Sequence, residues 1–213
     1  MKYDWIDKAN SILIVGRKRS GKTALAYKLL ENSKKPVYVY GNPKPELIRA
    51  LGYDVLYSLE DLERCQNITL WIDEVQLFLK HYDKTHNSAL QRLLSISAHR
   101  DITIILSTSD TRFINKALES YIDVWLVKDI EVMLVKRGSM IKNIIRKYAL
   151  IDEEGFRLNN NEYIVYSINF QEINGRFTFK LPNYFTEEHS KPFRIANESA
   201  NEIKNKVRIK LRK

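Results

Sequence analysis

The residues from Gly16 to Thr23 combine glycine, lysine and threonine in a spacing that suits the binding of a phosphate chain. The stretch GRKRSGKT matches the pattern G-x-x-x-x-G-K-[ST] in full. Main-chain N–H groups of such a loop point at the anion, and the helix start behind it favours negative charge. We expect Lys22 to reach the β- and γ-phosphates of ATP and Thr23 to place its hydroxyl on Mg²⁺. The other expected nucleotide contacts are Gly16, Arg19, Ser20, Gly21 and Ala24.

A pair of acids follows an apolar run further along the chain. The segment ITLWIDE, residues 68–74, ends in Asp73 and Glu74. Asp73 is expected to hold Mg²⁺, and Glu74 to polarise the water that attacks the γ-phosphate. Solvated acids at a strand end are the alternative, but the complete phosphate-binding pattern upstream favours a catalytic pair. An adjacent glutamate indicates hydrolysis rather than binding alone.

Polar residues also follow the apolar run at residues 102–106. The sequence there continues Ser107-Thr108-Ser109-Asp110. A polar side chain at such a strand tip can lie between the metal and the γ-phosphate, and Thr108 and Ser109 are the candidates. Ordinary turn chemistry is the alternative. We assign Ser109 as a nucleotide contact.

The phosphate-binding loop, the acid pair and the polar strand tip can meet only if several strands end at the same edge of a sheet. The pattern of apolar residues predicts such a sheet. Short apolar runs predict buried strands at residues 11–15, 37–40, 55–57, 68–72, 102–106 and 123–127. Helical spacing or capping signals predict helices at residues 22–31, 45–51, 58–64, 87–99 and 111–120. Strands that alternate with helices predict a mainly parallel sheet covered on both faces, which is an α/β three-layer fold.

The last part of the chain has a different pattern. Segments 162–170 and 176–181 flank Asn174-Gly175, a dipeptide typical of a tight hairpin turn. Residues 203–213 form a basic tail, and within it residues 207–213 alternate apolar and basic side chains, which suits an added strand or a basic arm. We expect a single domain over residues 1–213, with its core at about 10–130 and an extension at 131–213 that carries a β-hairpin at 162–181.

Composition limits the class of protein. The chain has 213 residues, 44% of them hydrophobic, and no apolar run approaches a membrane span or a signal peptide. The single cysteine, Cys65, excludes an intramolecular disulfide, and we expect an intracellular protein. The net charge of +9 favours a polyanionic partner.

The order of these motifs resembles the FtsK/HerA superfamily of DNA-pumping ATPases. The more specific matches are Asn42-Pro43-Lys44-Pro45-Glu46 after the second predicted strand and Ala98-His99-Arg100 shortly before ITIIL. In size and motif order the chain is most similar to the small genome-packaging ATPases of membrane-containing and archaeal viruses. It departs from the superfamily at Asn42, where an acid is usual, and at Ser109, where glutamine is usual.

The resemblance implies a RecA-like P-loop core that forms a hexameric or pentameric ring and uses ATP and Mg²⁺ to drive double-stranded DNA into a capsid. ATP would lie between subunits, with Arg100 as first choice for a catalytic arginine inserted by the neighbour, and Arg92 or Arg112 as alternatives. A capsid or internal membrane protein would be a further partner, in the host cytoplasm or on the virion. Candidate DNA contacts are residues 80–84, residues 136–139, Lys142, Arg146 and Lys147.

Three other functions are compatible with the same motifs. The assembly and export ATPases of filamentous phages, of the zonular-occludens-toxin type, are similar but usually carry a transmembrane segment. A P-loop metabolite kinase would need an acceptor site. A nucleotide-gated DNA-binding scaffold would bind ATP without needing to hydrolyse it.

Overall fold

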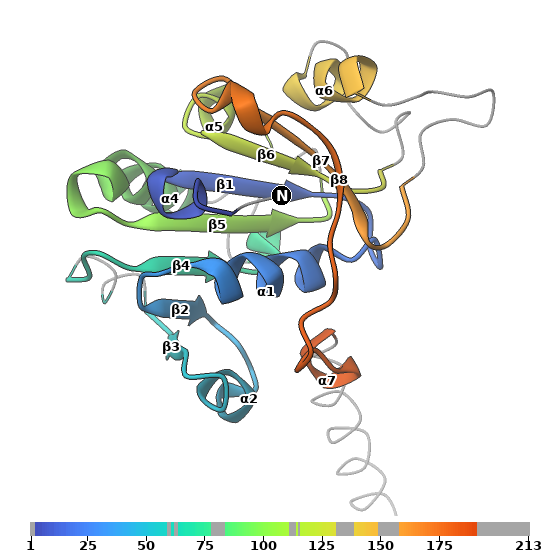
Figure 1. The fold of residues 1–213 in the computed structure, drawn as a ribbon. Helices are drawn as coiled ribbons and strands as arrows, with labels where there is room; N and C mark the ends of the chain where they lie inside the picture. The colour runs from blue at the N-terminus through green and yellow to red at the C-terminus, as the bar shows by residue number, and fades with distance from the viewer. Residues whose placement is uncertain are drawn as a thin grey trace, which may run out of the picture.

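The computed structural model describes residues 3–58, 61, 64–77, 84–110, 114, 116–130, 139–148 and 158–190 (Figure 1). Its strands are β1 (Ser11–Val15), β2 (Val37–Tyr40), β3 (Asp54–Leu56), β4 (Thr69–Ile72), β5 (Thr103–Thr108), β6 (Val124–Val127), β7 (Glu162–Ser167) and β8 (Gly175–Thr178). Its α-helices are α1 (Lys22–Asn32), α2 (Pro45–Arg49), α4 (Lys84–Ser97), α5 (Lys116–Glu119), α6 (Met140–Tyr148) and α7 (Glu187–Ser190). Short 3-10 helices are η1 (Ile6–Lys8), η2 (Val75–Leu77), η3 (Ala98–Arg100) and η6 (Gln171–Ile173).

The strands form one sheet in the order β3-β2-β4-β5-β1-β6-β7-β8. Every pairing from β3 to β6 is parallel, whereas β7 pairs antiparallel with β6 and β8 antiparallel with β7. The carboxyl ends of β1, β4 and β5 therefore meet at one edge, with β5 between the other two. This confirms the expected α/β fold with a mainly parallel sheet.

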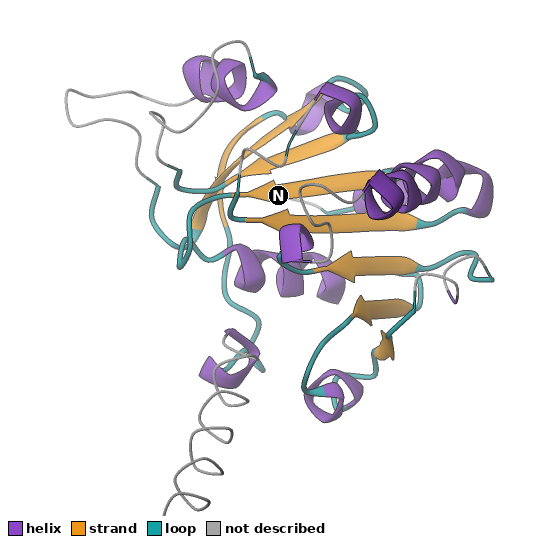
Figure 2. Ribbon diagram, turned by 180° about the vertical axis from the view of Figure 1, so that it is seen from behind, coloured by secondary structure: helices purple, strands orange, loops and turns teal. Residues whose placement is uncertain are grey.

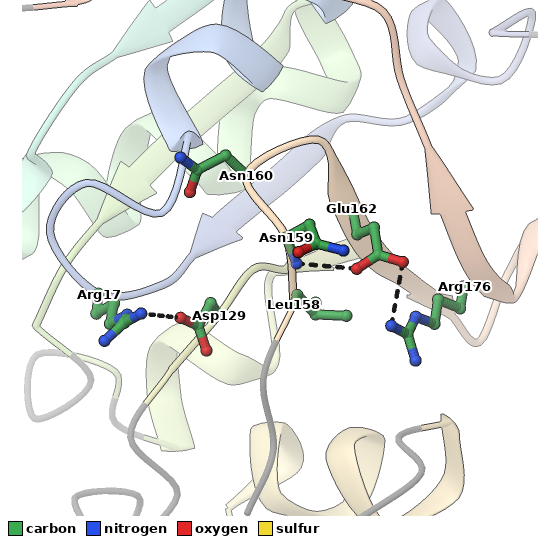
Figure 3. A pocket seen from close by; sticks show the side chains of 7 residues that line it. All are labelled: Arg17, Asp129, Leu158, Asn159, Asn160, Glu162 and Arg176. Atoms are coloured by element: carbon green, nitrogen blue, oxygen red, sulfur yellow. Dashed lines mark hydrogen bonds and ion pairs between the residues drawn. The ribbon is translucent and has the colours of Figure 1, made fainter.

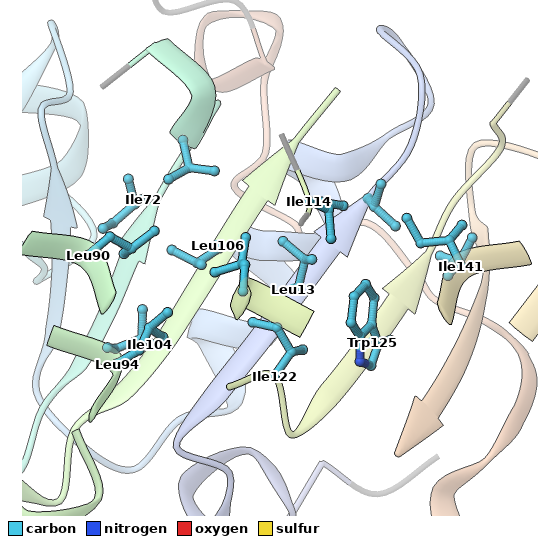
Figure 4. Close-up of a cluster of buried hydrophobic side chains, with 14 of the residues drawn as sticks. Leu13, Ile72, Leu90, Leu94, Ile104, Leu106, Ile114, Ile122, Trp125 and Ile141 are labelled. Atoms are coloured by element: carbon cyan, nitrogen blue, oxygen red, sulfur yellow. The ribbon is translucent and has the colours of Figure 1, made fainter. Parts of the chain in front are cut away.

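Helices cover both faces of the sheet, as Figures 1 and 2 show from opposite sides. Consecutive strand residues contribute to different core clusters, so that Leu13 and Val15 face one side while Ile12 and Ile14 face the other. The first cluster packs beneath α4, α5 and α6 (Figure 4), and the second beneath α1. Strands buried on both faces are the physical cause of the continuous apolar runs in the sequence.

Two elements differ from the expectation drawn from sequence. β5 continues to Thr108 instead of ending at Leu106, and all its residues are buried. Helix α6 was not expected, because polar and basic residues interrupt its apolar residues and it contains no long apolar run. Its buried residues, Ile141, Ile144 and Ile145, form the narrow apolar stripe of an amphipathic helix packed against the core.

The expected C-terminal hairpin is present, but the prediction of a tight Asn174-Gly175 turn was wrong. β7 ends at Ser167, and the connection to β8 is longer and includes η6. The Asn174 amide accepts from the Ser167 N–H at 2.6 Å and donates to the Ser167 carbonyl at 2.9 Å. Asn174 thus closes a wider loop, and Gly175 opens the next strand opposite Val165.

Several sequence-based expectations lie outside the described residues. They include most of the helix at 58–64, the start of the helix at 111–120, Arg112, the basic segments at 80–83 and 136–138, and the tail at 203–213. None of the helices within the described part of the chain is long and apolar enough to cross a membrane.

A pair of isoleucine substitutions tests the placement of the core. Ile104 is 0% exposed in the central strand β5, whereas Ile168 is 62% exposed after β7. We expect Ile104→Ala to lower the free energy of unfolding by about 2–5 kcal/mol, since it leaves a cavity, and Ile168→Ala to change it by about 0.5 kcal/mol or less. Urea unfolding followed by circular dichroism measures both, and equal losses would contradict this packing.

Candidate nucleotide-binding and hydrolytic site

The start of the phosphate-binding loop is held by the strands on either side of β1. The Gly16 N–H donates to the Thr108 carbonyl at the end of β5. On the other side, the Arg17 N–H donates to the Asp129 carbonyl at 2.8 Å, and the Lys128 N–H donates to the Val15 carbonyl at 2.8 Å. The loop therefore leaves the sheet at a fixed position.

The glycines of the loop stand where a side chain would not fit. A Cβ on Gly16 would lie 2.6 Å from the Cβ of Lys128, and one on Gly21 would lie 2.5 Å from the carbonyl oxygen of Asn160. Arg19 and Gly21 have φ values of 65° and 88°, the left-handed conformation that turns successive N–H groups toward one concavity. The buried Ser20 hydroxyl has no hydrogen-bond partner among the described residues. These features fit a loop shaped for an anion.

Lys22 lies beneath the loop and is only 4% exposed. Its Nζ donates to the Arg17 carbonyl at 3.2 Å and lies 3.5 Å from Glu74 Oε1. A buried ammonium must be compensated by anionic or carbonyl groups. The expected phosphate ligand and the expected catalytic acid are therefore in direct electrostatic contact across the edge of the sheet.

Thr23 and Asp73 bring together the two oxygens expected to hold Mg²⁺. Thr23 Oγ1 lies 3.5 Å from Asp73 Oδ2. Neighbouring ligands of an octahedral Mg²⁺, with bonds of about 2.1 Å, lie about 3 Å apart. A small closure would therefore let both oxygens bind one ion, so the pair fits the metal.

Hydrogen bonds orient Asp73, and burial raises its pKa. Ser107, at the end of β5, donates its hydroxyl to Asp73 Oδ1, and the Glu74 N–H donates to the same oxygen at 3.0 Å. Burial raises the pKa of Asp73 to about 6, and the hydrogen bond from Ser107 only partly offsets that rise. A cation at this position would favour the ionised form.

Glu74 is held by the tip of β5 and by Gln76. Its Oε2 accepts from Ser109 Oγ at 2.9 Å and from Gln76 Nε2, while Gln76 Oε1 accepts from Thr108 Oγ1 at 2.7 Å. Burial alone would raise the pKa of Glu74, but the Lys22 ammonium and the hydrogen bonds from Gln76 and Ser109 hold it below its usual value. The carboxylate is thus ionised at neutral pH.

The main chain at Glu74 is unusual. Its φ of 45° lies in the left-handed region, which non-glycine residues rarely adopt and which is often found at functional sites. The turn directs the carboxylate away from the line of β4 and toward Lys22 and Ser109.

A polar cavity of about 360 Å³ adjoins the loop beside the start of the C-terminal hairpin (Figure 3). An ion pair between Arg17 and Asp129, 2.5 Å long, borders one side, and an ion pair between Arg176 and Glu162, 3.1 Å long, borders the other. Arg17, one of three consecutive basic residues in the loop, is thereby tied to Asp129. The lining residues are Arg17, Asp129, Leu158, Asn159, Asn160, Glu162 and Arg176.

Arg100 lies away from this site. It ends η3, and its carbonyl accepts from the Asn67 N–H just before β4 begins, so it stands at the amino edge of the sheet. It does not reach the phosphate loop of its own chain.

Two other residues singled out in the sequence lie as follows. Arg92, the alternative to Arg100, lies on α4. Asn42 forms a local turn in which its Oδ1 accepts a hydrogen bond from the Lys44 N–H.

Three residues of the site were missed by sequence reasoning. Ser107 was placed after the strand, because the apolar run stops at Leu106. Gln76 follows the acid pair and could have been considered from its position alone. Lys128 is a lone lysine after an apolar run, and nothing in the sequence distinguishes it from a surface residue.

A phosphate loop between β1 and α1, with an acid pair at the end of β4 and a polar strand tip between them, defines a P-loop nucleoside triphosphatase. The chain belongs to the AAA domain family, which matches residues 8–132. It is therefore a P-loop ATPase, as the motifs predicted. Among curated proteins, none matches the chain by sequence.

Solved structures of viral packaging ATPases share the fold. B204, the DNA-packaging ATPase of Sulfolobus turreted icosahedral virus, is 17% identical with a TM-score of 0.56, over 81% of this chain and 98% of that one. B204 of Sulfolobus turreted icosahedral virus 2, in complex with ATP-gammaS, is 17% identical with a TM-score of 0.57, over 80% of this chain and 97% of that one.

A secretion ATPase has a similar fold. The cytoplasmic domain of EccC, a type VII secretion ATPase of Thermomonospora curvata, is 10% identical with a TM-score of 0.56, over 84% of this chain but 24% of that one. The expected resemblance to ATPases of this kind is confirmed at the level of the fold.

Gln76 provides a test of how Glu74 is held. In Gln76→Leu, Glu74 and Thr108 lose their shared partner, while Lys22 and Thr23 keep theirs. We expect the kcat for ATP to fall about 10-fold to 100-fold through loss of orientation, with little change in KM. The matched control is Gln171→Leu, on η6 at the opposite edge, which should behave as wild type in a coupled phosphate-release assay. An unchanged kcat in Gln76→Leu would contradict this role.

Proposed function

We propose that the protein hydrolyses Mg·ATP at this site and uses the energy to move double-stranded DNA into a viral capsid. The observation that carries the first part is the contact of 3.5 Å between Lys22 Nζ and Glu74 Oε1. It joins a group suited to the phosphate chain with a group suited to activating water, at an edge that also holds Thr23 and Asp73.

The proposed hydrolysis assigns one task to each group. Lys22 and the loop N–H groups bind the phosphates and offset their charge. Mg²⁺, held through Thr23 and Asp73, would supply further positive charge. Glu74, ionised at neutral pH, orients the attacking water and accepts its proton. Ser109 and Gln76 keep the carboxylate in place before ATP arrives.

Three observations support the proposed DNA-packaging role. The fold similarity extends over nearly the whole of a viral DNA-packaging ATPase. The net charge of +9 suits a polyanion. Helix α6 also presents Lys142, Arg146 and Lys147, which we propose as contacts to DNA phosphates, because a translocating protein must bind the duplex without reading its sequence.

We also propose that the protein acts as a ring, in the host cytoplasm or on the virion, with a capsid or internal membrane protein as a further partner. Arg100 stands at the amino edge of the sheet, away from the site of its own chain, and we assign it to the site of a neighbour. An arginine supplied in trans would stabilise the charge that develops on the transferred phosphoryl group.

Glu74→Gln separates hydrolysis from binding. We expect turnover to fall about 10²-fold to 10⁴-fold, because the amide cannot accept the proton, while ATP affinity stays within a few-fold. Glu172→Gln, on η6, is the matched control and should turn over ATP as wild type does.

Addition of duplex DNA tests the proposed translocation. The ATP turnover of the wild-type protein should rise when duplex DNA is added, and light scattering should measure the particle mass in the same samples. Turnover indifferent to DNA would refute translocation, and dependence on a small acceptor would indicate a kinase.

Mixing two inactive variants tests the trans arginine. We expect Arg100→Ala and Glu74→Gln each to be nearly inactive, since an arginine finger contributes about 10³-fold to 10⁵-fold. When mixed, a Glu74→Gln subunit can lend its Arg100 to the intact Glu74 site of an Arg100→Ala subunit, so ATPase activity should return.

The control for this mixture is the doubly substituted chain, Glu74→Gln with Arg100→Ala, which has no arginine to lend. Mixed with Arg100→Ala, it should restore nothing. If the first mixture also stays inactive, Arg100 does not act between subunits.

A further inference from the structure

Lys128 is a fully buried lysine that no part of the proposed hydrolysis uses. It follows β6 and is 0% exposed. Its Nζ donates to the Asn160 carbonyl at 2.7 Å and to the Glu162 carbonyl, and lies 5.0 Å from the centre of the Phe179 ring. All three contacts belong to the segment that forms the C-terminal hairpin.

The main chain around Lys128 holds the first half of the phosphate loop. Its N–H donates to the Val15 carbonyl, and the next carbonyl, of Asp129, accepts from the Arg17 N–H. Gly16 approaches so closely that an added Cβ would lie 2.6 Å from the Lys128 Cβ.

The side chain of Lys128 reaches the second half of the loop through Asn160. A Cβ on Gly21 would lie 2.5 Å from the Asn160 carbonyl oxygen and 3.6 Å from Lys128 Cε. Figure 3 shows Asn160 beside the start of α1, with the cavity between the loop and the hairpin. Lys128 therefore connects the two segments that Gly16 and Gly21 contact, which are residues 128–129 and the start of the hairpin at Asn160.

A buried charge at this position needs a reason. Removing an ammonium from water is costly, and an apolar side chain of similar length would fill the same space. Burial lowers the pKa of Lys128 to about 7, although Glu162 and Asp129 favour its charged form. Those two carboxylates are themselves paired with Arg176 and Arg17. The hydrogen bonds that Lys128 Nζ makes are therefore those to the carbonyls of Asn160 and Glu162, and only a hydrogen-bond donor can make them.

We propose that Lys128 is a positioning residue that sets the shape of the phosphate loop by fixing residues 160–162 against Gly21. The inference rests on the proposed binding of ATP by this loop and adds a structural determinant of its affinity. Lys128 acts through main-chain contacts and does not touch the nucleotide. Without it, the wall behind Gly21 can move away, and the loop loses the conformation that directs its N–H groups at the phosphates.

The test is Lys128→Met, which keeps the length of the side chain but cannot donate. Calorimetric titration should show ATP binding at least about 10-fold weaker, because the two hydrogen bonds from Lys128 Nζ to main-chain carbonyls are lost. Mg-pyrophosphate, which lacks the nucleoside, should weaken in parallel. In an ATPase assay the KM should rise more than kcat falls, because Glu74 and its partners keep their contacts.

The matched control is Lys35→Met, at the amino edge of the sheet. Lys35 Nζ also donates to several oxygens, those of Asp101 and Thr103. This variant should lose similar stability, as measured by the melting temperature without ligand, yet bind ATP and pyrophosphate within about twofold of wild type.

The outcomes separate this inference from the proposed function. If wild type binds neither ligand, the proposed ATP binding fails. If wild type binds and folded Lys128→Met binds equally well, the positioning role is overturned, and it is also overturned if ATP weakens while pyrophosphate does not. If Lys128→Met does not fold, Lys128→Gln, which can still donate to one carbonyl, should bind with reduced affinity, and wild-type affinity there would overturn the proposal.

Discussion

The parallel order of β4, β5 and β1 is the constraint on which the site depends. Parallel strands end at one edge, so the phosphate loop after β1 and the acids after β4 must project to the same side. The strand between them, β5, sets their separation and ends in the hydroxyls that bind both acids. Because these positions are fixed by sheet register, Lys22 and Glu74 come into contact at this edge of the sheet.

That contact also shows how the protein tolerates several charges in a confined space. Lys22 is almost completely buried, and Glu74 compensates part of its charge while keeping a low pKa. Asp73, close by, has its pKa raised by the same burial. The pKa values of the two neighbouring acids thus move in opposite directions: that of Glu74 lies below its usual value, whereas that of Asp73 is raised and would be lowered by a bound cation.

Sequence reasoning found the part of the site that is local in the chain. The phosphate loop, Thr23 and the acid pair are motifs in which spacing alone determines geometry, and the alternation of apolar strands and helices predicted the sheet. Ser107 and Gln76 were missed because their roles arise from pairing between β4 and β5, which no single segment encodes. Lys128 was missed because its partners are main-chain carbonyls more than thirty residues away, and α6 because its apolar stripe is narrow.

The C-terminal hairpin forms the part of the site that the sequence did not predict. A tight turn at Asn174-Gly175 would have been a local feature, but the amide of Asn174 instead spans a wider loop back to Ser167. The hairpin extends the sheet antiparallel to β6, so its first residues, 160–162, arrive at the carboxyl edge beside Gly21. A segment outside the family match at residues 8–132 thus forms one wall of the phosphate loop. The motif specifies which groups face the phosphates, but the shape of the loop depends on an extension that the motif does not contain.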